Sequence, residues 1–199
     1  GQQFALTTPK RQYEKIPLAL LGDHQIENAV TAIYTIEVLE SLGWSVGLEA
    51  IGQGLRTVYW PGRLEYLWLK APVIFDGAHN EAGARVLAQA IPKYFRYKKM
   101  IFVLGILADK EREQIINHLG PIGDVFIITK SPNARAGQWD DLSELLKKFN
   151  KKVLVQENNR EAVDLAFRMV EDGDFICITG SLYLISGIRE YVLKNYTLT

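Results

Sequence analysis

Several polar side chains in this sequence follow directly after apolar runs, and their types suit the binding of a phosphorylated ligand. Asp76 and His79 follow the apolar run 73–75, and Arg63 lies thirteen positions before Asp76. The run predicts a buried strand, and ligands of open α/β sheets bind outside the carboxyl ends of such strands. Arginine offers phosphate a planar set of donors and a permanent charge. The three residues therefore predict a nucleotide-phosphate site. In the structural alternative, Asp76 caps the next helix together with Asn80.

A second polar group lies where another strand is expected to give way to a helix. Asp23, His24 and Asn28 stand at the start of a segment whose apolar residues recur at helical spacing from Ile26 onward. The amino-terminal end of a helix attracts anions and nucleotides. The alternative is that Asp23 caps this helix and that the other two side chains are structural.

Three further groups are expected at strand ends later in the chain. Asp109 and Lys110 follow one predicted strand, and capping of the next helix by Asp109 is the favoured interpretation there. Arg135 lies in a polar loop that follows the next predicted strand. Ser181 begins the last helix, where its hydroxyl could cap the helix or hold a carboxylate.

Composition and charge exclude several classes of protein. Lys plus Arg and Asp plus Glu are equal at 23 each, whereas nucleic-acid binding needs a basic surplus or stripe. No apolar stretch approaches the roughly 18 residues of a membrane span. The single cysteine, Cys177, rules out a disulfide framework and favours a reducing, cytoplasmic location. Three widely spaced histidines without a ligand cluster leave no metal site to expect in this chain.

The spacing of apolar residues predicts an α/β fold. After a polar stretch without clear periodicity over 1–15, a strand is expected over 16–21 and helices over 26–42 and 48–57. From residue 72 onward strands alternate with helices, which is typical of a doubly wound, mainly parallel sheet covered on both faces. The expected strands are 73–76, 100–104, 124–129, 152–156 and 174–179, and the expected helices are 81–96, 110–119, 140–149, 160–170 and 182–194.

The two parts of the chain are expected to differ in completeness. Residues 72–199 have the elements of a whole domain, whereas residues 1–60 offer a strand and two helices, too little to bury a sizeable core. We therefore interpret 1–60 as the tail of a larger domain, and 61–71 as a linker that includes a first strand or hairpin arm.

Taken together, the motifs resemble the Mur ligase superfamily, and most closely its folylpolyglutamate synthase/dihydrofolate synthase branch. The matching runs are His24-Gln25-x-x-Asn28-Ala29, Trp60-Pro61-Gly62-Arg63-Leu64-Glu65, Asp76-Gly77-Ala78-His79-Asn80, Asp109-Lys110, Asn133-x-Arg135-Ala136 and Thr179-Gly180-Ser181-Leu182-Tyr183. Each run alone is weak evidence. Their order and spacing together are specific, and they extend through nearly the whole chain.

The resemblance implies an ATP-dependent ligase that adds L-glutamate to folate or dihydropteroate through an acyl phosphate. It implies that residues 1–60 are the C-terminal tail of the central ATPase domain, and that 72–199 form the Rossmann-like C-terminal domain, with the active site in the cleft between the two domains. The family's phosphate loop and Mg²⁺ ligands belong to an N-terminal ATPase part that this sequence does not contain. We therefore expect the chain alone to be inactive.

The same resemblance implies roles for individual residues. Asn28 matches the asparagine that contacts adenine, Arg63 the arginine on the ATP phosphates, and Asp76 the acid that contacts the nucleotide. His79 matches a histidine beside that site, so Arg63 and His79 are the expected catalytic residues. Ser181 falls in a motif that faces the cleft, which implies a role with the incoming glutamate.

Two alternatives remain open. One is another Mur-type amide ligase, acting on peptidoglycan precursors or on cyanophycin. The other is a non-catalytic domain that binds a ligand or a protein partner. Gln25 next to His24 and the Trp-Pro-Gly-Arg-Leu-Glu run favour the folate branch.

Overall fold

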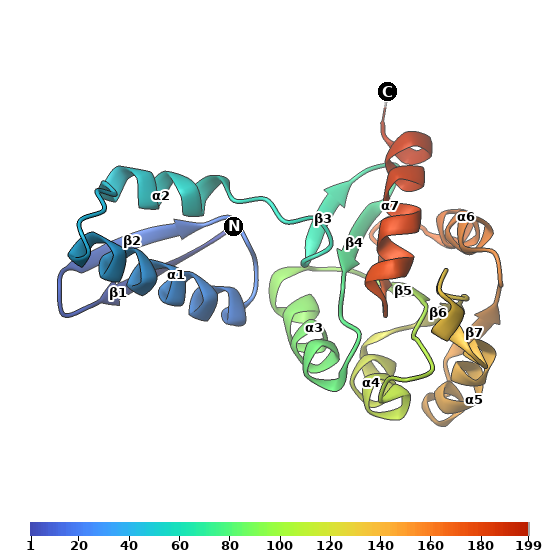
Figure 1. Ribbon diagram of the computed structural model, residues 1–199. Coiled ribbons are helices and arrows are strands. Elements are labelled where there is room, and N and C mark those ends of the chain that lie inside the picture. Colours follow the sequence, from blue (N-terminus) through green and yellow to red (C-terminus); the bar gives the residue numbers. More distant parts are fainter. Residues whose placement is uncertain (199) are drawn as a thin grey trace. The chain divides into compact units, whose positions relative to one another are not determined.

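The computed structural model describes residues 1–198, and the chain divides into two compact units, Gly1–Trp60 and Pro61–Thr199. The first unit is an antiparallel strand pair with two helices (Figure 1). Its elements are β1 (Gln2–Thr7), β2 (Gln12–Leu18), α1 (Asp23–Ser41) and α2 (Leu48–Thr57).

The hairpin β1–β2 corrects the sequence prediction for this unit. No element was predicted over 1–15, where the sequence shows no clear periodicity, and a strand was expected over 16–21, whereas β2 covers Gln12–Leu18. The strand β1 alternates between half-buried and exposed residues without one fully buried side chain, and its register shifts between Phe4 and Leu6. A half-exposed strand with an irregular register leaves a weak apolar pattern in the sequence, because neither face is fully apolar.

A buried carboxylate joins the hairpin to α1. Glu37 is 3% exposed and accepts hydrogen bonds from the hydroxyls of Thr8 and Tyr13, each at 2.8 Å. Burial, followed by the hydrogen bond to Glu37, raises the pKa of Tyr13 to about 12. The phenol therefore stays a donor at neutral pH, and a buried charge of this kind is tolerated because it is hydrogen-bonded.

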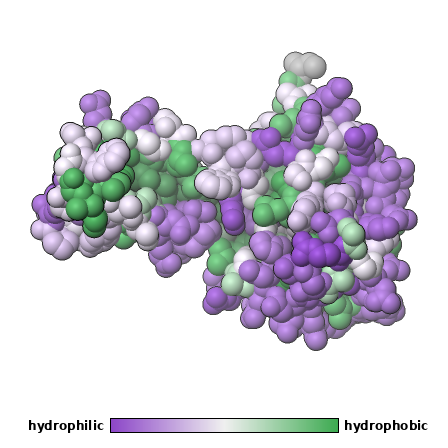
Figure 2. Space-filling model, viewed as in Figure 1, coloured by the Kyte–Doolittle hydropathy of each residue, from purple (hydrophilic) through white to green (hydrophobic). Residues whose placement is uncertain are grey.

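The apolar core of the first unit is small. Four buried residues form its centre: Tyr13, Ile16, Ile33 and Ile51. Large apolar side chains remain exposed near the point where α1 ends and α2 begins, including Val38, Leu42 and Leu48 (Figure 2, the green area at the left of this unit). The interpretation of this unit as the tail of a larger domain stays a prediction.

The second unit alternates strands and helices. Its elements are β3 (Glu65–Trp68), β4 (Pro72–Asp76), α3 (Glu81–Tyr94), β5 (Met100–Leu104), α4 (Arg112–Leu119), β6 (Val125–Ile128), α5 (Leu142–Leu146), β7 (Lys152–Val155), α6 (Asn159–Met169), β8 (Phe175–Thr179) and α7 (Leu182–Tyr196). Within residues 61–198 the strands form one sheet in the order β3-β4-β8-β5-β6-β7. All neighbours pair in parallel except β3, which runs antiparallel to β4. The α/β, doubly wound, mainly parallel fold is confirmed.

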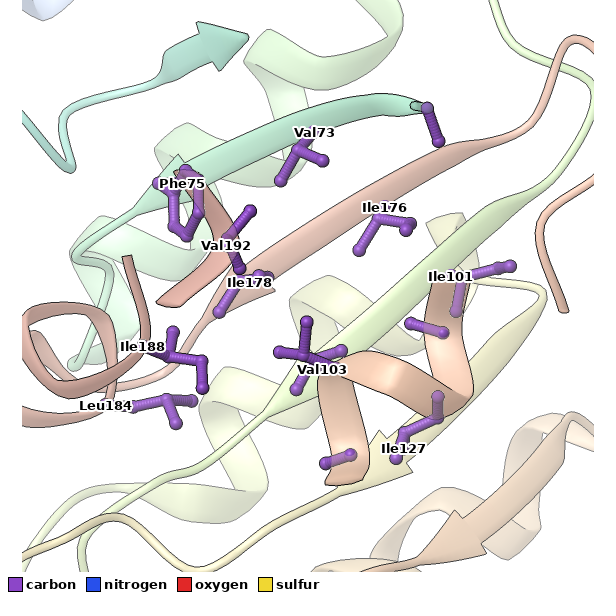
Figure 3. Packing of buried hydrophobic residues seen from close by; sticks show 14 of the residues in the cluster. Val73, Phe75, Ile101, Val103, Ile127, Ile176, Ile178, Leu184, Ile188 and Val192 are labelled. Atoms are coloured by element: carbon purple, nitrogen blue, oxygen red, sulfur yellow. The ribbon is translucent and has the colours of Figure 1, made fainter. Parts of the chain in front are cut away.

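Helices cover both faces of this sheet (Figure 1). The helices α6 and α7 pack on one face, where valine and isoleucine from β4, β5, β6 and β8 meet residues such as Leu184, Ile188 and Val192 (Figure 3). The helices α3, α4 and α5 lie on the opposite face, where the rings of Phe102 and Phe126 stack with centroids 5.2 Å apart. Strands buried on both faces read as continuous apolar runs, which is why their positions were predicted closely from the sequence.

One predicted helix is broken into pieces. Residues 140–149 were expected to be a single helix, but they contain the 3₁₀ turns η3 (Trp139–Asp141) and η4 (Lys147–Phe149) on either side of the short α5. Only Leu142 and Leu146 are fully buried along this segment. Packing therefore anchors a single helical turn, and the flanking residues tighten into 3₁₀ geometry.

No helix among residues 1–198 is long and apolar enough to cross a membrane. The longest of the described helices is α1, with 19 residues, and it carries acidic side chains within its span.

Cys177 lies in the middle of β8 and is fully buried. Burial, with a smaller contribution from the negative charge of Asp76, raises the pKa of its thiol well above the usual value. Since the thiolate is the reactive form, we expect the folded chain to resist an aromatic disulfide reagent at pH 8 and the chain in denaturant to release one equivalent of chromophore. Labelling of the folded chain at the rate of free cysteine would contradict this placement.

Candidate active site at the carboxyl ends of the central strands

Three neighbouring strands end side by side and bring their following loops together. Asp76 at the end of β4 pairs with Thr179 at the end of β8, and Thr179 pairs with Leu104 at the end of β5. Because these strands are parallel, the segments after them start from the same edge of the sheet. This is the edge at which open α/β folds bind ligands.

A pocket of about 120 Å³ lies at this edge. It is lined by residues from the segments that follow β4, β5, β6 and β8: His79, Leu107, Lys110, Arg135, Ser181, Leu182 and Tyr183. The pocket thus joins two cationic side chains, an imidazole and a hydroxyl. His79 and Ser181, which were predicted as site residues, are brought together here.

Ser181 lines the pocket and directly precedes the first turn of α7. It is 1% exposed, it accepts a hydrogen bond from the N–H of Tyr183 at 3.1 Å, and it receives the Ser131 hydroxyl at 3.0 Å. The sequence left open whether Ser181 caps the helix or holds a carboxylate, and the structure shows that it is the N-cap of α7. Gly180 precedes it with φ +102°, and a Cβ there would lie 2.9 Å from the carbonyl oxygen of Gly105. The turn therefore requires glycine.

Arg135 and Asp109 form an ion pair at the pocket. Nη1 of Arg135 lies 2.9 Å from Oδ2 of Asp109, and its guanidinium carbon lies 5.8 Å from the ring centroid of Tyr183. Capping by Asp109, the favoured sequence-based interpretation, is wrong. The helix α4 begins three residues later with Glu111 as its N-cap and no side-chain capping bond, so the carboxylate is free to pair with the loop after β6.

The imidazole of His79 has a defined hydrogen position. Its Nδ1 lies 2.8 Å from the carbonyl oxygen of Gly77. A carbonyl can only accept, so Nδ1 donates the hydrogen and Nε2 of the neutral ring is left as an acceptor. Asn80, as expected, caps α3 by accepting the N–H of Gly83 at 2.8 Å. The hydrogen bonds of His79 and Asn80 therefore hold the turn after β4 in place, while Nε2 of His79 can still accept a hydrogen bond.

Asp76 ties the end of β4 to the loop that carries Arg63. Its Oδ2 accepts the N–H of Leu64 at 2.8 Å and its Oδ1 accepts the N–H of Ala78 at 2.9 Å. The N–H of Gly77 also donates to the carbonyl oxygen of Gly62 at 2.8 Å. Asp76 is thus hydrogen-bonded to the backbone next to Arg63, the residue with which it was predicted to act. The helix-cap alternative for Asp76 does not hold, because Asn80 is the N-cap.

Arg63 itself is exposed and makes no hydrogen bond or ion pair within the described part of the chain. Its neighbour Leu64 is buried with a left-handed φ of +44°, an unfavourable conformation for a side chain of this size. The contact between Leu64 and Asp76 holds this conformation in place. A fixed backbone with an unoccupied guanidinium suits the binding of an anion.

Sequence reasoning missed the ion pair that fixes the same loop from the other side. Glu65 is 6% exposed and accepts hydrogen bonds from Arg189 on α7 at both carboxylate oxygens, including one of 2.6 Å from Nη2 and one of 2.9 Å from Nε. It also accepts the N–H of Gly62 at 2.9 Å. The two partners are 124 positions apart. The one available signal was a glutamate beside the glycine turn, and the sequence held no indication of its partner.

Asn28, the predicted adenine contact, lies in the first unit. It is exposed on α1 and its amide nitrogen donates to Oε1 of Gln25 at 3.1 Å. The proposed cap Asp23 is wrong, because the N-cap of α1 is Gly22, with φ +110°, and no side chain caps the helix. A Cβ at position 22 would lie 2.6 Å from the imidazole of His24, so the histidine packs where only glycine leaves space.

Comparison with known proteins identifies the family of the chain and its fold. Residues 62–182, the greater part of the chain, match the family model described as Mur ligase, glutamate ligase domain. The chain belongs to this Mur ligase family. Within it, the matched range contains Arg63, Asp76, His79 and Ser181.

Two curated relatives of this Mur ligase chain carry the names of folate enzymes. It is 32% identical over 191 residues to the dihydrofolate synthase/folylpolyglutamate synthase of Bacillus subtilis, covering 96% of this chain and 44% of the relative. It is 35% identical over 176 residues to the enzyme of the same name from Mycobacterium tuberculosis, covering 86% of this chain and 36% of the relative. The chain therefore spans less than half the length of these relatives.

Solved structures agree with the fold of this Mur ligase chain. The folylpolyglutamate synthase of Mycobacterium tuberculosis, complexed with ADP and AMPPCP, matches with a TM-score of 0.81 and 32% identity, over 90% of this chain and 42% of that one. The folylpolyglutamate synthase of Thermotoga maritima matches with a TM-score of 0.77 and 35% identity, over 94% of this chain and 42% of that one. The resemblance to the folate branch is confirmed by these similarities.

The double role of Asp76 as an acceptor predicts a loss of stability in Asp76→Asn. An amide keeps one acceptor oxygen but turns a donor group toward one of the two backbone N–H groups. A buried hydrogen bond to a charged group contributes about 1.5–3 kcal/mol, so the melting temperature of the chain should fall clearly. Asp172→Asn, at an exposed position, is the matched control. Equal melting of the two variants would remove Asp76 from its structural role.

Proposed function

We propose that this chain is the amino-acid-accepting part of an ATP-dependent ligase that joins L-glutamate to folate or dihydropteroate. In this reaction ATP phosphorylates a carboxylate of the pterin substrate, giving an acyl phosphate and ADP. The amine of glutamate then attacks the acyl carbon, phosphate leaves, and the amine loses a proton as the amide forms. The observation that carries the proposal is the pocket lined by Lys110, Arg135, Ser181 and His79, in a domain of the glutamate ligase family.

The pocket has the charge that a dicarboxylic amino acid requires. Lys110 and Arg135 come from different loops, so that each can meet one carboxylate. Arginine can engage a carboxylate with two parallel hydrogen bonds, whereas lysine acts as a compact charge. Ser181 adds a hydroxyl between the two loops and the start of α7.

His79 is suited to prepare the amine for attack. A glutamate amine is protonated at neutral pH and must lose a proton before it becomes a nucleophile. Nε2 of the neutral imidazole is an acceptor, because Nδ1 donates to Gly77. We assign His79 the role of general base toward the ammonium group, with Gly77 holding the ring in the required tautomer.

Arg63 and Asp76 would bind the nucleotide at the same edge of the sheet. Arg63 would bind the transferred phosphoryl group, where its charge offsets the negative charge that develops during transfer. Asp76 would contact the nucleotide from the end of β4, beside the loop that carries Arg63. Asn28 is assigned to adenine.

Mg²⁺ is expected to assist phosphoryl transfer by neutralising charge on the phosphates. Among residues 1–198 no group of three His, Cys, Asp or Glu side chains could hold a metal ion. We therefore assign the Mg²⁺ ligands to the ATPase part of the ligase rather than to this chain. Structures related to this one hold ADP, AMPPCP or, in the enzyme of Yersinia pestis, AMPPNP with a manganese ion.

The first unit is proposed to be the C-terminal tail of that ATPase domain. Support comes from its small core, from the exposed side chains of Val38, Leu42 and Leu48, and from the greater length of the relatives. In this proposal the chain alone does not turn over, and the ATPase domain is its main protein partner.

The role of the pocket predicts a selective loss of glutamate affinity. In the intact ligase, Lys110→Ala and Arg135→Ala should each raise the KM for glutamate by roughly ten- to a hundredfold, since a hydrogen bond to a charged group contributes about 1.5–3 kcal/mol. The KM for ATP should stay nearly unchanged. Lys98→Ala, which removes a lysine at the opposite end of the strands, beside Gly173, is the matched control. Unchanged glutamate kinetics in both pocket variants would overturn the assignment of this pocket.

The role of Arg63 predicts a different pattern. In the intact ligase, Arg63→Ala should lower kcat by about 10²–10³-fold, as expected when one donor to developing charge is removed, and should change the affinity for the pterin substrate little. Steady-state kinetics at saturating ATP separate the two effects. Arg85→Ala, on α3, serves as the control for charge, and full turnover by the Arg63 variant would exclude Arg63 from the site.

A further inference from the structure

Arg112 stands at the first position of α4 and connects two loops that otherwise belong to different strands. Its Nε donates to the carbonyl oxygen of Leu107 at 3.1 Å and its Nη2 to that of Ile106 at 3.2 Å, both in the loop after β5. Its Nη1 donates to the carbonyl oxygen of Gln138 at 2.8 Å and its Nη2 also to that of Ala136 at 2.6 Å, both in the loop after β6. All four acceptors are backbone atoms.

These two loops carry the two cations of the pocket. Lys110 lies in the first loop, two positions before Arg112, and Arg135 lies in the second, directly before Ala136. Arg112 does not line the pocket itself. A backbone hydrogen bond from the N–H of Ala108 to the carbonyl oxygen of Arg135, at 2.8 Å, also joins the two loops.

Helix stability does not explain the presence of an arginine at this position. A positive charge in the first turn of a helix opposes the helix dipole. Burial of the guanidinium also lowers the pKa of Arg112, although nearby Asp141, Asp109 and Asp140 oppose this shift. Both effects are unfavourable, so the arginine must be stabilised by its hydrogen bonds to the four carbonyl groups of the two loops.

We propose that Arg112 is a positioning residue that sets the separation of Lys110 and Arg135, and thereby the spacing of the two carboxylates that the pocket accepts. This inference rests on the proposed role of the pocket in binding glutamate. A planar guanidinium has donors on three nitrogens in fixed directions, so one side chain can hold two loops in a defined relation. A lysine at the same position has a single nitrogen and can reach only part of this set.

The pocket geometry is also tight where the loops meet. Gly137 has φ +55°, and a Cβ there would lie 2.7 Å from the Cβ of Ala108. The second loop thus approaches the first more closely than ordinary side chains permit. Loss of Arg112 leaves the carbonyl groups of Ile106 and Ala136 without this donor in a buried setting, and the loops relax by moving apart.

The test uses Arg112→Lys and Arg112→Ala in the intact ligase. The KM for glutamate should rise by about ten- to a hundredfold, since a small misplacement of binding groups has effects of this size, while the KM for ATP stays constant. The ratio of kcat/KM for glutamate over aspartate should fall, because aspartate is shorter by one methylene and tests the spacing directly. Added methylguanidinium should restore part of the glutamate affinity in Arg112→Ala and leave Arg112→Lys unchanged.

Arg96→Ala is the matched control, because Arg96 is exposed, lies just after α3 and donates to the carbonyl oxygen of Pro92 near the end of that helix. Unchanged glutamate KM and selectivity in both Arg112 variants would overturn the proposal. So would a loss of folding, or an equal loss in all kinetic constants, because each outcome assigns Arg112 a general structural role. If Lys110→Ala and Arg135→Ala leave glutamate kinetics intact, the proposed function of the pocket fails first, and this result is distinct from a failure of Arg112 alone.

Discussion

The carboxylate of Asp76 is the interaction on which the rest of the candidate site depends. It ends the first parallel strand of the sheet and accepts N–H groups from both the preceding loop and the following turn. Without this acceptor, the hydrogen bond that offsets the unfavourable left-handed backbone conformation of Leu64 would be lost. The backbone position of Arg63 would then no longer be fixed. One side chain thus joins the loop that carries Arg63 to the strand end that precedes His79. The geometry of the site is set by backbone donors rather than by contacts among the functional side chains.

The charge of the chain is distributed in a way that its composition does not reveal. The formal net charge is zero, yet Lys110 and Arg135 converge on one small pocket. Within residues 1–198, Asp109 is the carboxylate that is paired with them. Parallel strands make this possible, because segments that are far apart in the sequence start from the same edge of the sheet. Local concentration of positive charge therefore arises from topology, and a neutral protein can still attract an anionic substrate.

The elements that the sequence predicted well are those whose burial leaves a strong pattern. The central strands β4, β5, β6 and β8 are apolar on both faces, and their ranges were placed within one or two residues. The hairpin β1–β2 was missed because its strands are half-exposed. The carboxylate of Asp76 contacts the backbone of Leu64, next to Arg63, and the strand end and the glycine turn that place them are both visible locally in the sequence. The roles expected for Asp76 and Arg63 stay predictions. Glu65–Arg189 and the four bonds of Arg112 could not be predicted, because each depends on elements that meet only in the folded sheet.

The partner of Glu65 also has a consequence for the order in which the site is completed. The strand β3 is short, and side chains alternate between its faces, so a slip of one residue against β4 would turn Glu65 away from α7. The two-pronged contact with Arg189 can form only in the correct alignment. Arg189 follows Glu65 by 124 positions, so α7 is synthesised well after the loop with Arg63. This loop therefore gains the support of the ion pair late in biosynthesis, once α7 has been made and has packed on the sheet.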